Sequence, residues 1–416
     1  MTRRLAAALV AATAAVLTMA ACGSSDDSTS DGTITLKLVG ADYGTGPADT
    51  TQKYWQQIAD EFHKQNPSIT VEVTTINWTD YDTKVKTQLQ NKDYPDVLQG
   101  VFYPQYATNG LVAPLSEILS KPDIGTSTFK EAFSVDGVQY AAPFVTSARA
   151  MYYNKKAFAE AGIAKPPTTW AELETAAKAL KAKGYIGYAL PLGPEEAQAE
   201  STLWMLGNGG GWKNGDSYAI NSPQNVETFT FLKNLVNSGL TQPNPATYDR
   251  TANAAADFAA GKVGMEFNGP FLTATIASAG KLAETDYATA PVPGRTGPVD
   301  QTLGVADAIQ AFKTDDADKA AAIKKFLDFA LTDEHQLAFA KQYALLPGTQ
   351  SALDSLKGDP VLGTFAELLP QTVQFPSDEK WTAAVLPAVK KNIGLAVTDD
   401  PARVLGDLQA KATAGR

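Results

Sequence analysis

ITLKLVG (residues 34–40), WQQIADEF (55–62) and ITVEV (69–73) are the three segments that decide the fold of this chain. The first and third alternate apolar and polar residues with the period of a β-strand, whereas the apolar residues of the second recur at helical spacing. Pro67 is expected to end the helix. A strand, a helix and a second strand in this order predict two parallel strands joined by a crossover helix.

The same alternation continues along the chain. We expect a helix over Tyr81–Gln90, a strand over Pro95–Gln99 and a helix over Trp170–Ala182, which Thr169 would cap at its N-terminus with Glu172 three residues later. Further helices are expected near 226–237, 253–260, 318–330 and 333–342, and further strands near 264–268 and 302–312. The fold class is therefore α/β, with mainly parallel sheets flanked by helices.

The N-terminus has the features of a secretory signal peptide over residues 1–21. Arg3 and Arg4 precede a short, alanine-rich apolar stretch, and small residues lead to Cys22. That stretch is too short to span a membrane, which takes about 18 apolar residues. We therefore expect the mature chain outside the cytoplasm.

Cys22 is the only cysteine, so no disulfide can form within the chain. Its position after Met19-Ala20-Ala21 resembles a bacterial lipobox, in which the cysteine is lipidated, although Met19 stands where leucine is usual. Acyl chains at Cys22 would anchor the protein to the membrane, and the alternative is an unmodified residue behind an ordinary cleavage site. Residues 22–33 are polar after the cysteine and are expected to form the anchor and a flexible tether.

Length and charge limit the possible functions. The 395 residues that follow the signal peptide suffice for two domains. The net charge is −10 for the whole chain and −12 without Arg3 and Arg4, so the surface would repel nucleic acids. We expect a monomer without a nucleic-acid partner.

Several ordered segments resemble the extracellular solute-binding proteins of bacterial ABC importers, and in particular the sugar-binding group that includes maltose-binding protein. Together the segments cover nearly the whole mature chain. They are EFHKQNPSITVEV (61–73), YPDV (94–97), LVAPL (111–115), YAAPF (140–144), MYYNKKAF (151–158), AGI (161–163), PTTWAEL (167–173), DFAAGKVGM (257–265), NGPF (268–271), IKKFLDF (323–329) and LP (346–347).

The resemblance implies a two-lobe periplasmic-binding-protein-like fold with a hinged cleft. Residues 34–144 and 268–313 would form lobe 1, and residues 145–267 and 314–416 lobe 2, with crossings near residues 142–146, 267–269 and 313. The implied function is a binding lipoprotein, not an enzyme, on the extracytoplasmic face of the cell membrane. It would capture a sugar or oligosaccharide between its lobes and deliver it to the membrane subunits of an ABC importer.

A sugar presents hydroxyl groups at its edge and C–H groups on its faces, so its site needs polar side chains and aromatic rings at the carboxyl ends of strands. Asp42 and Tyr43 follow the first strand, although an ordinary Asx turn with an exposed tyrosine would give the same pattern. Phe102 and Tyr103 follow the strand that ends at Gln99.

Ser147 and Arg149 lie on the expected first crossing, where residues two apart share a face. Both are candidate ligand contacts, and a structural ion pair is the alternative for Arg149. The resemblance also implies ligand contacts near Glu200 and Trp204, although Trp204 fits core packing equally well.

Four later residues complete the candidate set. At Asn268-Gly269-Pro270-Phe271, many relatives carry a tryptophan in place of Phe271 and stack it on a sugar ring. Asp307 is a candidate acceptor for a hydroxyl group. Trp381 stands isolated after the polar run Asp378-Glu379-Lys380, and an exposed tryptophan there would favour a ligand contact over lid packing.

Other chemistries lack their motifs. The glycines of 40–46 and 209–211 do not have the spacing of nucleotide-binding loops, and the only histidines, His63 and His335, cannot form a zinc site with Cys22. No cofactor or metal is expected. The alternatives are a binder of a polyamine, a phosphodiester or a peptide, and a secreted glycoside hydrolase, which would need two facing carboxylates. Arg149 alone offers a cation for an anionic ligand, whereas Asp42, Glu200 and Asp307 would suit a polyamine.

Overall fold

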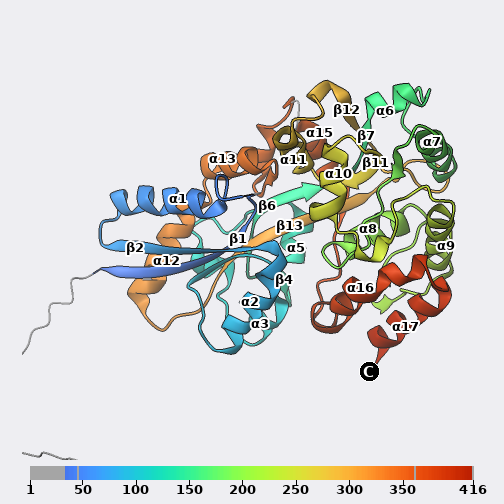
Figure 1. The fold of residues 1–416 in the computed structure, drawn as a ribbon. Coiled ribbons are helices and arrows are strands. Elements are labelled where there is room, and N and C mark those ends of the chain that lie inside the picture. Colours follow the sequence, from blue (N-terminus) through green and yellow to red (C-terminus); the bar gives the residue numbers. More distant parts are fainter. Residues whose placement is uncertain (1–32, 45, 360–361, 415–416) are drawn as a thin grey trace, which may run out of the picture.

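The computed structural model describes residues 33–44, 46–359 and 362–414. The expected signal peptide, the lipid anchor at Cys22 and nearly all of the tether lie outside these residues. The described chain forms two lobes, each built on its own sheet (Figure 1). The two-lobe α/β fold expected from the sequence is confirmed.

The first lobe contains the segments that open the chain. β1 (Ile34–Asp42) pairs in parallel with β2 (Ile69–Asn77) along its whole length and with β3 (Val97–Gly100) on its other side. The sheet continues antiparallel through β13 (Thr302–Ala311), β6 (Ala142–Ala148) and β14 (Leu346–Pro347), and β15 (Thr372–Val373) pairs with β13. Its helices are α1 (Thr51–Gln65), α2 (Trp78–Gln90), α3 (Pro104–Thr108), α4 (Leu115–Ile118), α5 (Ser127–Ala132), α12 (Ala317–Ala330), α13 (Asp333–Tyr343) and α14 (Gln350–Asp354).

The second lobe has a four-stranded sheet. β7 (Ala150–Asn154) lies between β11 (Val263–Asn268) and β12 (Tyr287–Ala290), antiparallel to both, and β8 (Ile186–Tyr188) pairs in parallel with β11. Its helices are α6 (Lys155–Glu160), α7 (Trp170–Ala182), α8 (Ala197–Leu206), α9 (Pro223–Asn237), α10 (Ala256–Ala259), α11 (Leu272–Ala279), α16 (Leu386–Asn392) and α17 (Pro401–Thr413).

Short elements complete the two lobes. Two hairpins are formed by β4 (Ser134–Val135) with β5 (Val138–Gln139) and by β9 (Lys213–Asn214) with β10 (Ser217–Tyr218). α15 (Gly363–Leu368) packs on β6. The remaining short helical turns are η1 (Pro245–Thr247), η2 (Arg250–Ala255), η3 (Glu284–Asp286), η4 (Leu369–Gln371), η5 (Trp381–Val385) and η6 (Ile393–Val397).

Apolar packing holds each sheet between helices. α1 buries Trp55, Ile58 and Phe62 against the first sheet, as the helical spacing predicts. At α7, the amide of Glu172 donates to Thr169 Oγ1 at 3.2 Å, which confirms the predicted N-cap. A further cluster that includes Tyr152 contains residues of both lobes, so the lobes share a packed junction.

Two expectations about the lobes need correction. Both sheets are mixed rather than mainly parallel, because the strands that lead from one lobe to the other run antiparallel to their neighbours. The expected lobe boundaries also differ from the packing. Residues 314–416 were expected in lobe 2, but α12 and α13 cover the first sheet, and β14 and β15 are strands of that sheet. Residues 268–313 were expected in lobe 1, but α11 and β12 belong to the second lobe. These assignments depend on tertiary contacts that local periodicity does not encode.

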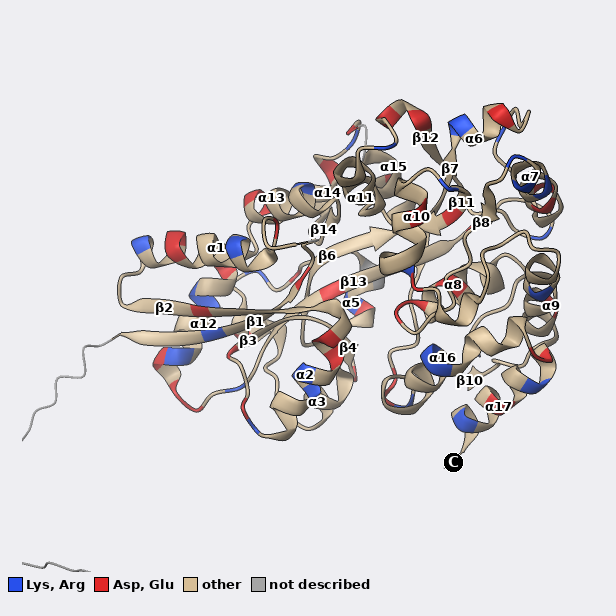
Figure 2. Ribbon diagram, viewed as in Figure 1, with Lys and Arg blue, Asp and Glu red and all other residues tan. Residues whose placement is uncertain are grey.

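The chain therefore passes between the lobes at Arg149, which separates β6 from β7, and returns between β12 and β13. It passes to the second lobe again after β15, so the crossings expected near residues 267–269 and 313 lie elsewhere. Figure 2 shows that charged residues of both signs lie mainly on the outer helices, whereas the strands are largely uncharged. Within the part of the chain that the structure describes, no helix is both long and apolar enough to cross a membrane.

Candidate functional site

One group of polar and aromatic side chains meets where strands of the first sheet end. We call Tyr43, Trp78, Gln99 and Asp307 the Tyr43 corner. Tyr43 follows β1, Trp78 follows β2, and the Tyr43 hydroxyl donates to Asp307 Oδ2 at 2.7 Å while it accepts from Gln99 Nε2 at 2.8 Å. The Trp78 ring lies edge-on to Tyr43, 5.4 Å between centroids, and Trp78 is 36% exposed. The corner thus combines an exposed ring with a tyrosine–carboxylate pair.

Asp307 lies opposite a β-bulge of β6. Asp307 pairs with Val145, but the next residue, Ala308, pairs with Pro143, so Phe144 has no partner on β13. Bulges of this kind redirect side chains and are frequent beside functional sites. Burial raises the pKa of Asp307 to about 7, although the Tyr43 hydrogen bond and Arg149 oppose the rise. Near neutral pH the carboxyl group can therefore either donate or accept a hydrogen bond.

The other candidates of the first lobe already have partners inside it. The Asp42 carboxylate accepts hydrogen bonds from the Gly44 and Thr51 amides at 3.0 and 2.8 Å, which is the turn that the sequence left as an alternative. Phe102 is buried edge-on against Phe133, with centroids 5.7 Å apart. Tyr103 is also buried and donates through its hydroxyl to Asp82 Oδ1 at 2.5 Å.

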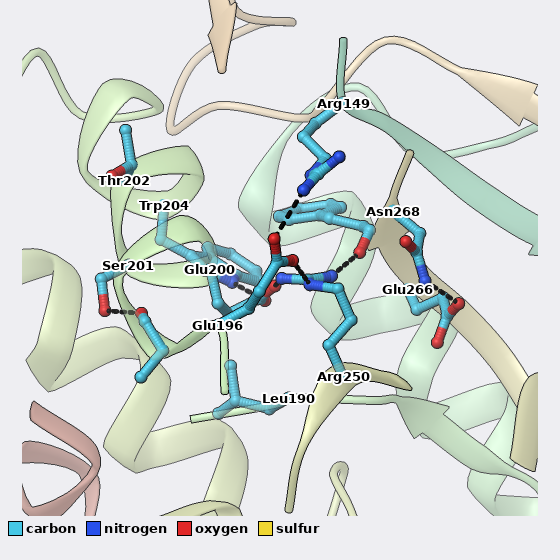
Figure 3. A network of polar contacts seen from close by, with 12 residues as sticks. Arg149, Leu190, Glu196, Glu200, Ser201, Thr202, Trp204, Arg250, Glu266 and Asn268 are labelled. Atoms are coloured by element: carbon cyan, nitrogen blue, oxygen red, sulfur yellow. Dashed lines mark hydrogen bonds and ion pairs between the residues drawn. The ribbon is translucent and has the colours of Figure 1, made fainter. Parts of the chain in front are cut away.

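A second set of charged side chains lies in the second lobe, next to the point where the chain passes from β6 to β7. We call Arg149, Glu196, Arg250 and Glu200 the crossover network (Figure 3). Arg149 Nη2 lies 2.7 Å from Glu196 Oε1, Glu196 Oε2 lies 2.5 Å from Arg250 Nε, and Arg250 Nη2 lies 2.8 Å from Glu200 Oε2. Arg250 also donates to the carbonyl of Phe267. Two arginines and two glutamates thus alternate and neutralise one another.

Glu200 and Trp204 belong to the core of the second lobe. Glu200 is 0% exposed, and its Oε1 accepts from the Tyr188 hydroxyl at 2.6 Å and from Trp204 Nε1 at 2.7 Å. Burial raises the pKa of Glu200, and Arg250 opposes the rise. Trp204 packs against Phe267, with ring centroids 5.0 Å apart. It therefore lies in the core, which is the alternative that the sequence left open for it.

Ser147 and Arg149 share one face of the crossing strand, as predicted. Arg149 Nη1 donates to Ser147 Oγ at 3.0 Å, and Arg149 is only 2% exposed. Its guanidinium carbon lies 5.0 Å from the centroid of the Phe271 ring, within the range of a cation–π contact. The structural ion pair that the sequence left open for Arg149 is present.

Asn268 and Phe271 lie on either side of Gly269 at the end of β11. Asn268 is buried, and its side chain donates to Glu266 Oε1 at 2.9 Å and accepts from the Gly269 amide at 2.8 Å. Burial raises the pKa of Glu266 to about 8. Phe271 is half-buried and is the aromatic candidate of the second lobe that retains exposed surface.

The expectation that Trp381 is exposed in a loop is wrong. Trp381 is 2% exposed and begins the helical turn η5. Its ring lies 5.1 Å from that of Trp212 in the core of the second lobe. The preceding Asp378 accepts from the Tyr218 hydroxyl at 2.8 Å and from the Trp381 amide at 3.0 Å. Asp378 of the polar run is therefore hydrogen-bonded within the second lobe, and the Trp381 ring is buried in the core of that lobe.

Sequence reasoning missed Trp78, Gln99 and Glu196. The test that selected Tyr43, namely a residue directly after a strand, would also have selected Trp78 after β2. Gln99 and Glu196 carry no comparable signal, because their roles arise from contacts with residues far away in the chain.

Two surface hollows lie away from these residues. One, of about 360 Å³, is lined by residues of α11 and the end of α13, including Ile276 and Lys341. The other, of about 420 Å³, lies beside α17 and is lined by Leu395 and Arg403. None of the twelve candidate ligand residues lines either hollow. Over the described residues, no group of three or more His, Cys, Asp or Glu side chains is arranged to hold a metal ion.

Known proteins resemble this chain in sequence over nearly its whole length. A putative binding protein of Brucella abortus is 28% identical over 91% of this chain and 92% of its own. The diacetylchitobiose-binding protein of Streptomyces coelicolor is 28% identical over 95% of this chain and 96% of its own.

Solved structures share the fold. An ABC substrate-binding protein of Listeria monocytogenes in complex with cycloalternan has a TM-score of 0.75 and 26% identity, covering 91% of this chain and 98% of its own. Maltose-bound MalE3 of T. maritima has a TM-score of 0.78 and 20% identity over 91% and 99%. The model of the family described as bacterial extracellular solute-binding protein matches residues 57–362. This chain therefore belongs to the bacterial extracellular solute-binding protein family.

Proposed function

We propose that this protein is the substrate-binding subunit of an ABC importer that captures a sugar or an oligosaccharide and delivers it to a membrane permease. The observation that carries the proposal is the Tyr43 corner, where the exposed Trp78 ring adjoins the hydrogen-bonded pair of Tyr43 and Asp307. A ring of this kind stacks on the C–H face of a sugar, and the polar pair binds its hydroxyl groups.

The proposed ligand face joins the Tyr43 corner to Phe271, and the two lobes would close on the sugar between them. Relatives support the ligand class, because one is named for diacetylchitobiose and others are in complex with maltose or cycloalternan. Of the other candidates, Asp42, Phe102, Tyr103, Ser147, Arg149, Glu200, Trp204, Asn268 and Trp381 have partners within the protein and would act in support of this face.

Membrane attachment is part of the proposal. Cleavage before Cys22 and lipidation of that cysteine would hold the protein at the extracytoplasmic face of the membrane, beside the permease. Labelling of cells with an alkyne-tagged fatty acid tests this step. We expect label on the wild-type protein and none on Cys22→Ser, and equal labelling of both would contradict the anchor.

A thermal-shift screen tests the function. The purified protein is heated with glucose, maltose, cyclic and linear oligosaccharides and diacetylchitobiose, and with spermidine, glycerol 3-phosphate and a peptide mixture as other ligand classes. A sugar at 100 times its Kd would stabilise the folded state by about 2.7 kcal/mol and raise Tm by several degrees. A shift with spermidine or glycerol 3-phosphate alone would replace the sugar assignment.

The same samples distinguish a binding protein from a glycoside hydrolase. Chromatography after prolonged incubation should recover the stabilising sugar unchanged. Release of shorter sugars would contradict the binding-protein assignment, because hydrolysis requires a pair of catalytic carboxyl groups at the bond.

A further inference from the structure

Arg149 occupies an unusual place in the chain. It is the single residue between β6 of the first sheet and β7 of the second. Its backbone is held on both sides by the neighbouring crossing strand, because its amide donates to the Leu303 carbonyl at 3.1 Å and its carbonyl accepts from Thr302 Oγ1 at 2.6 Å. The point from which the side chain extends is therefore fixed at the passage between the lobes.

The side chain of Arg149 makes polar contacts at its two terminal nitrogens. Nη1 donates to Ser147 on the first-lobe strand, whereas Nη2 pairs with Glu196 of the second lobe. Because Arg149 is 2% exposed, its guanidinium group has almost no surface left for a ligand. The contacts thus favour a role inside the protein.

The guanidinium carbon of Arg149 lies over the Phe271 ring, 5.0 Å from the ring centroid. Gly269 leaves room for this arrangement, since a Cβ atom there would lie 2.5 Å from both Arg149 Nη1 and the Phe271 ring. Phe271 is attached to the second lobe through β11 and α11, yet its ring packs against the apolar cluster of the first lobe. The ring is therefore in contact with both lobes and with the residue that connects them.

We propose that Arg149 is a positioning residue that sets the orientation of the Phe271 ring for ligand binding and does not itself contact the ligand. The part of this inference that concerns binding rests on the proposed function. Arginine suits the task because its planar group can stack on a ring and bind a carboxylate at the same time, whereas lysine has no planar group to stack. Glu196 pairs with the guanidinium group of Arg149, and Arg250 pairs in turn with Glu196.

A double-mutant cycle tests whether Arg149 acts through Phe271. Arg149→Met is made in the wild-type protein and in the Phe271→Ala background, and Kd is measured by calorimetry with the sugar that gives the largest thermal shift. We expect at least a tenfold loss of affinity in the wild-type background and less than a twofold loss in the Phe271→Ala background. An equal loss in both backgrounds would overturn the proposal, and a lower Tm with unchanged affinity would show a purely structural role.

Hydrogen exchange gives a readout without any ligand. The amides of Leu272, Thr273 and Ala274 donate to the carbonyls of residues 269–271, so their exchange reports on the segment that carries the ring. We expect Arg149→Met to accelerate this exchange at least fivefold and the exposed Arg403→Met to leave it unchanged. If no sugar binds the wild-type protein, the proposed function fails, but exchange still decides whether Arg149 holds Phe271.

Arg149→Lys keeps the test decisive if Arg149→Met does not fold. This variant retains a cation for Glu196 and loses the stacked plane, so we expect accelerated exchange at residues 272–274 with a smaller loss of Tm. Exchange at the wild-type rate in Arg149→Lys would overturn the proposal.

Discussion

The Tyr43 corner and the crossover network both bring a carboxyl group next to aromatic rings, but they differ in how much of these side chains is exposed. In the corner, the carboxyl group of Asp307 lies beside Tyr43 and Trp78. In the network, the carboxyl group of Glu200 accepts hydrogen bonds from its aromatic neighbours Tyr188 and Trp204. In the corner, Trp78 is exposed and Tyr43 and Asp307 are half-buried. In the network, Arg149, Arg250 and Glu200 are buried and bonded to one another or to their neighbours. Carboxyl groups beside aromatic rings can therefore lie at a partly exposed corner or in the interior of a lobe, depending on how the tertiary structure buries them.

The difference follows from the cost of burying charge. A buried carboxylate or guanidinium group must find a partner, because the unpaired ion loses its hydration without compensation. The crossover network meets this requirement with alternating charges. Among the described residues, Asp307 forms no ion pair, and burial raises its pKa to about 7. In the proposed function, Asp307 is the group of the corner that would bind a hydroxyl group of the ligand.

Arg250→Met should have the largest effect, because it leaves Glu200 and Glu196 without their shared cation. We expect a loss of about 3–5 kcal/mol in the free energy of unfolding, measured by urea denaturation. The matched control is Arg403→Met on the surface of α17, which should change stability by less than about 0.5 kcal/mol. A loss below about 1 kcal/mol for Arg250→Met would mean that the network does not stabilise the lobe.

Trp78→Ala should affect the ligand more than the fold. Because Trp78 is partly exposed, we expect its removal to cost less than about 1 kcal/mol of stability. Loss of a stacking ring should weaken sugar binding about tenfold, or about 1.4 kcal/mol, by calorimetry. Leu395→Ala removes another exposed apolar side chain, outside the corner, and should leave Kd unchanged. Equal affinity of Trp78→Ala and wild type would remove Trp78 from the ligand face.

Glu266→Gln should change the free energy of unfolding in a pH-dependent way. The pKa of Glu266 is raised from its ordinary value to about 8, so the folded state holds a proton that the unfolded chain has lost above about pH 4.5. This contribution to stability is present at low pH and declines as pH rises toward 8, by roughly 1 kcal/mol per pH unit.

Glutamine does not titrate, so the variant should gain stability relative to wild type between pH 5 and pH 8. Urea denaturation at several pH values measures this difference, and Glu131→Gln at an exposed site of α5 is the control. A stability difference between Glu266→Gln and wild type that does not vary with pH would contradict the raised pKa of Glu266.

Local pattern predicted much of the fold. The alternation in 34–39 and 69–73 and the apolar spacing between them correctly predicted β1, α1 and β2, because these elements follow from which side chains share a face. Tyr43 was found in the same way, from its place after a strand. The placement of α12, α13, α11 and β12 was not predictable locally, since an amphipathic helix does not specify which sheet it covers.

Among the candidate site residues, tertiary structure decided which ones remain exposed. Trp381 shows this most clearly, because its neighbours in sequence are charged while its neighbours in space are Trp212 and the core of the second lobe. Asp42 and Glu200 likewise satisfy their carboxylates with donors inside the protein. The sequence offered the turn at Asp42 as an alternative, whereas no pattern near Glu200 or Trp381 indicates their partners.

The amino-acid sequence by itself determined the alternation of strands and helices, the α/β class and the resemblance to solute-binding proteins, because these depend on local periodicity and on ordered motifs. The tertiary structure alone decided that Tyr43, Trp78 and Asp307 meet at one corner and that Arg149, Glu196, Arg250 and Glu200 neutralise one another. The physical reason is that burial and pairing of polar atoms depend on residues brought together from distant parts of the chain.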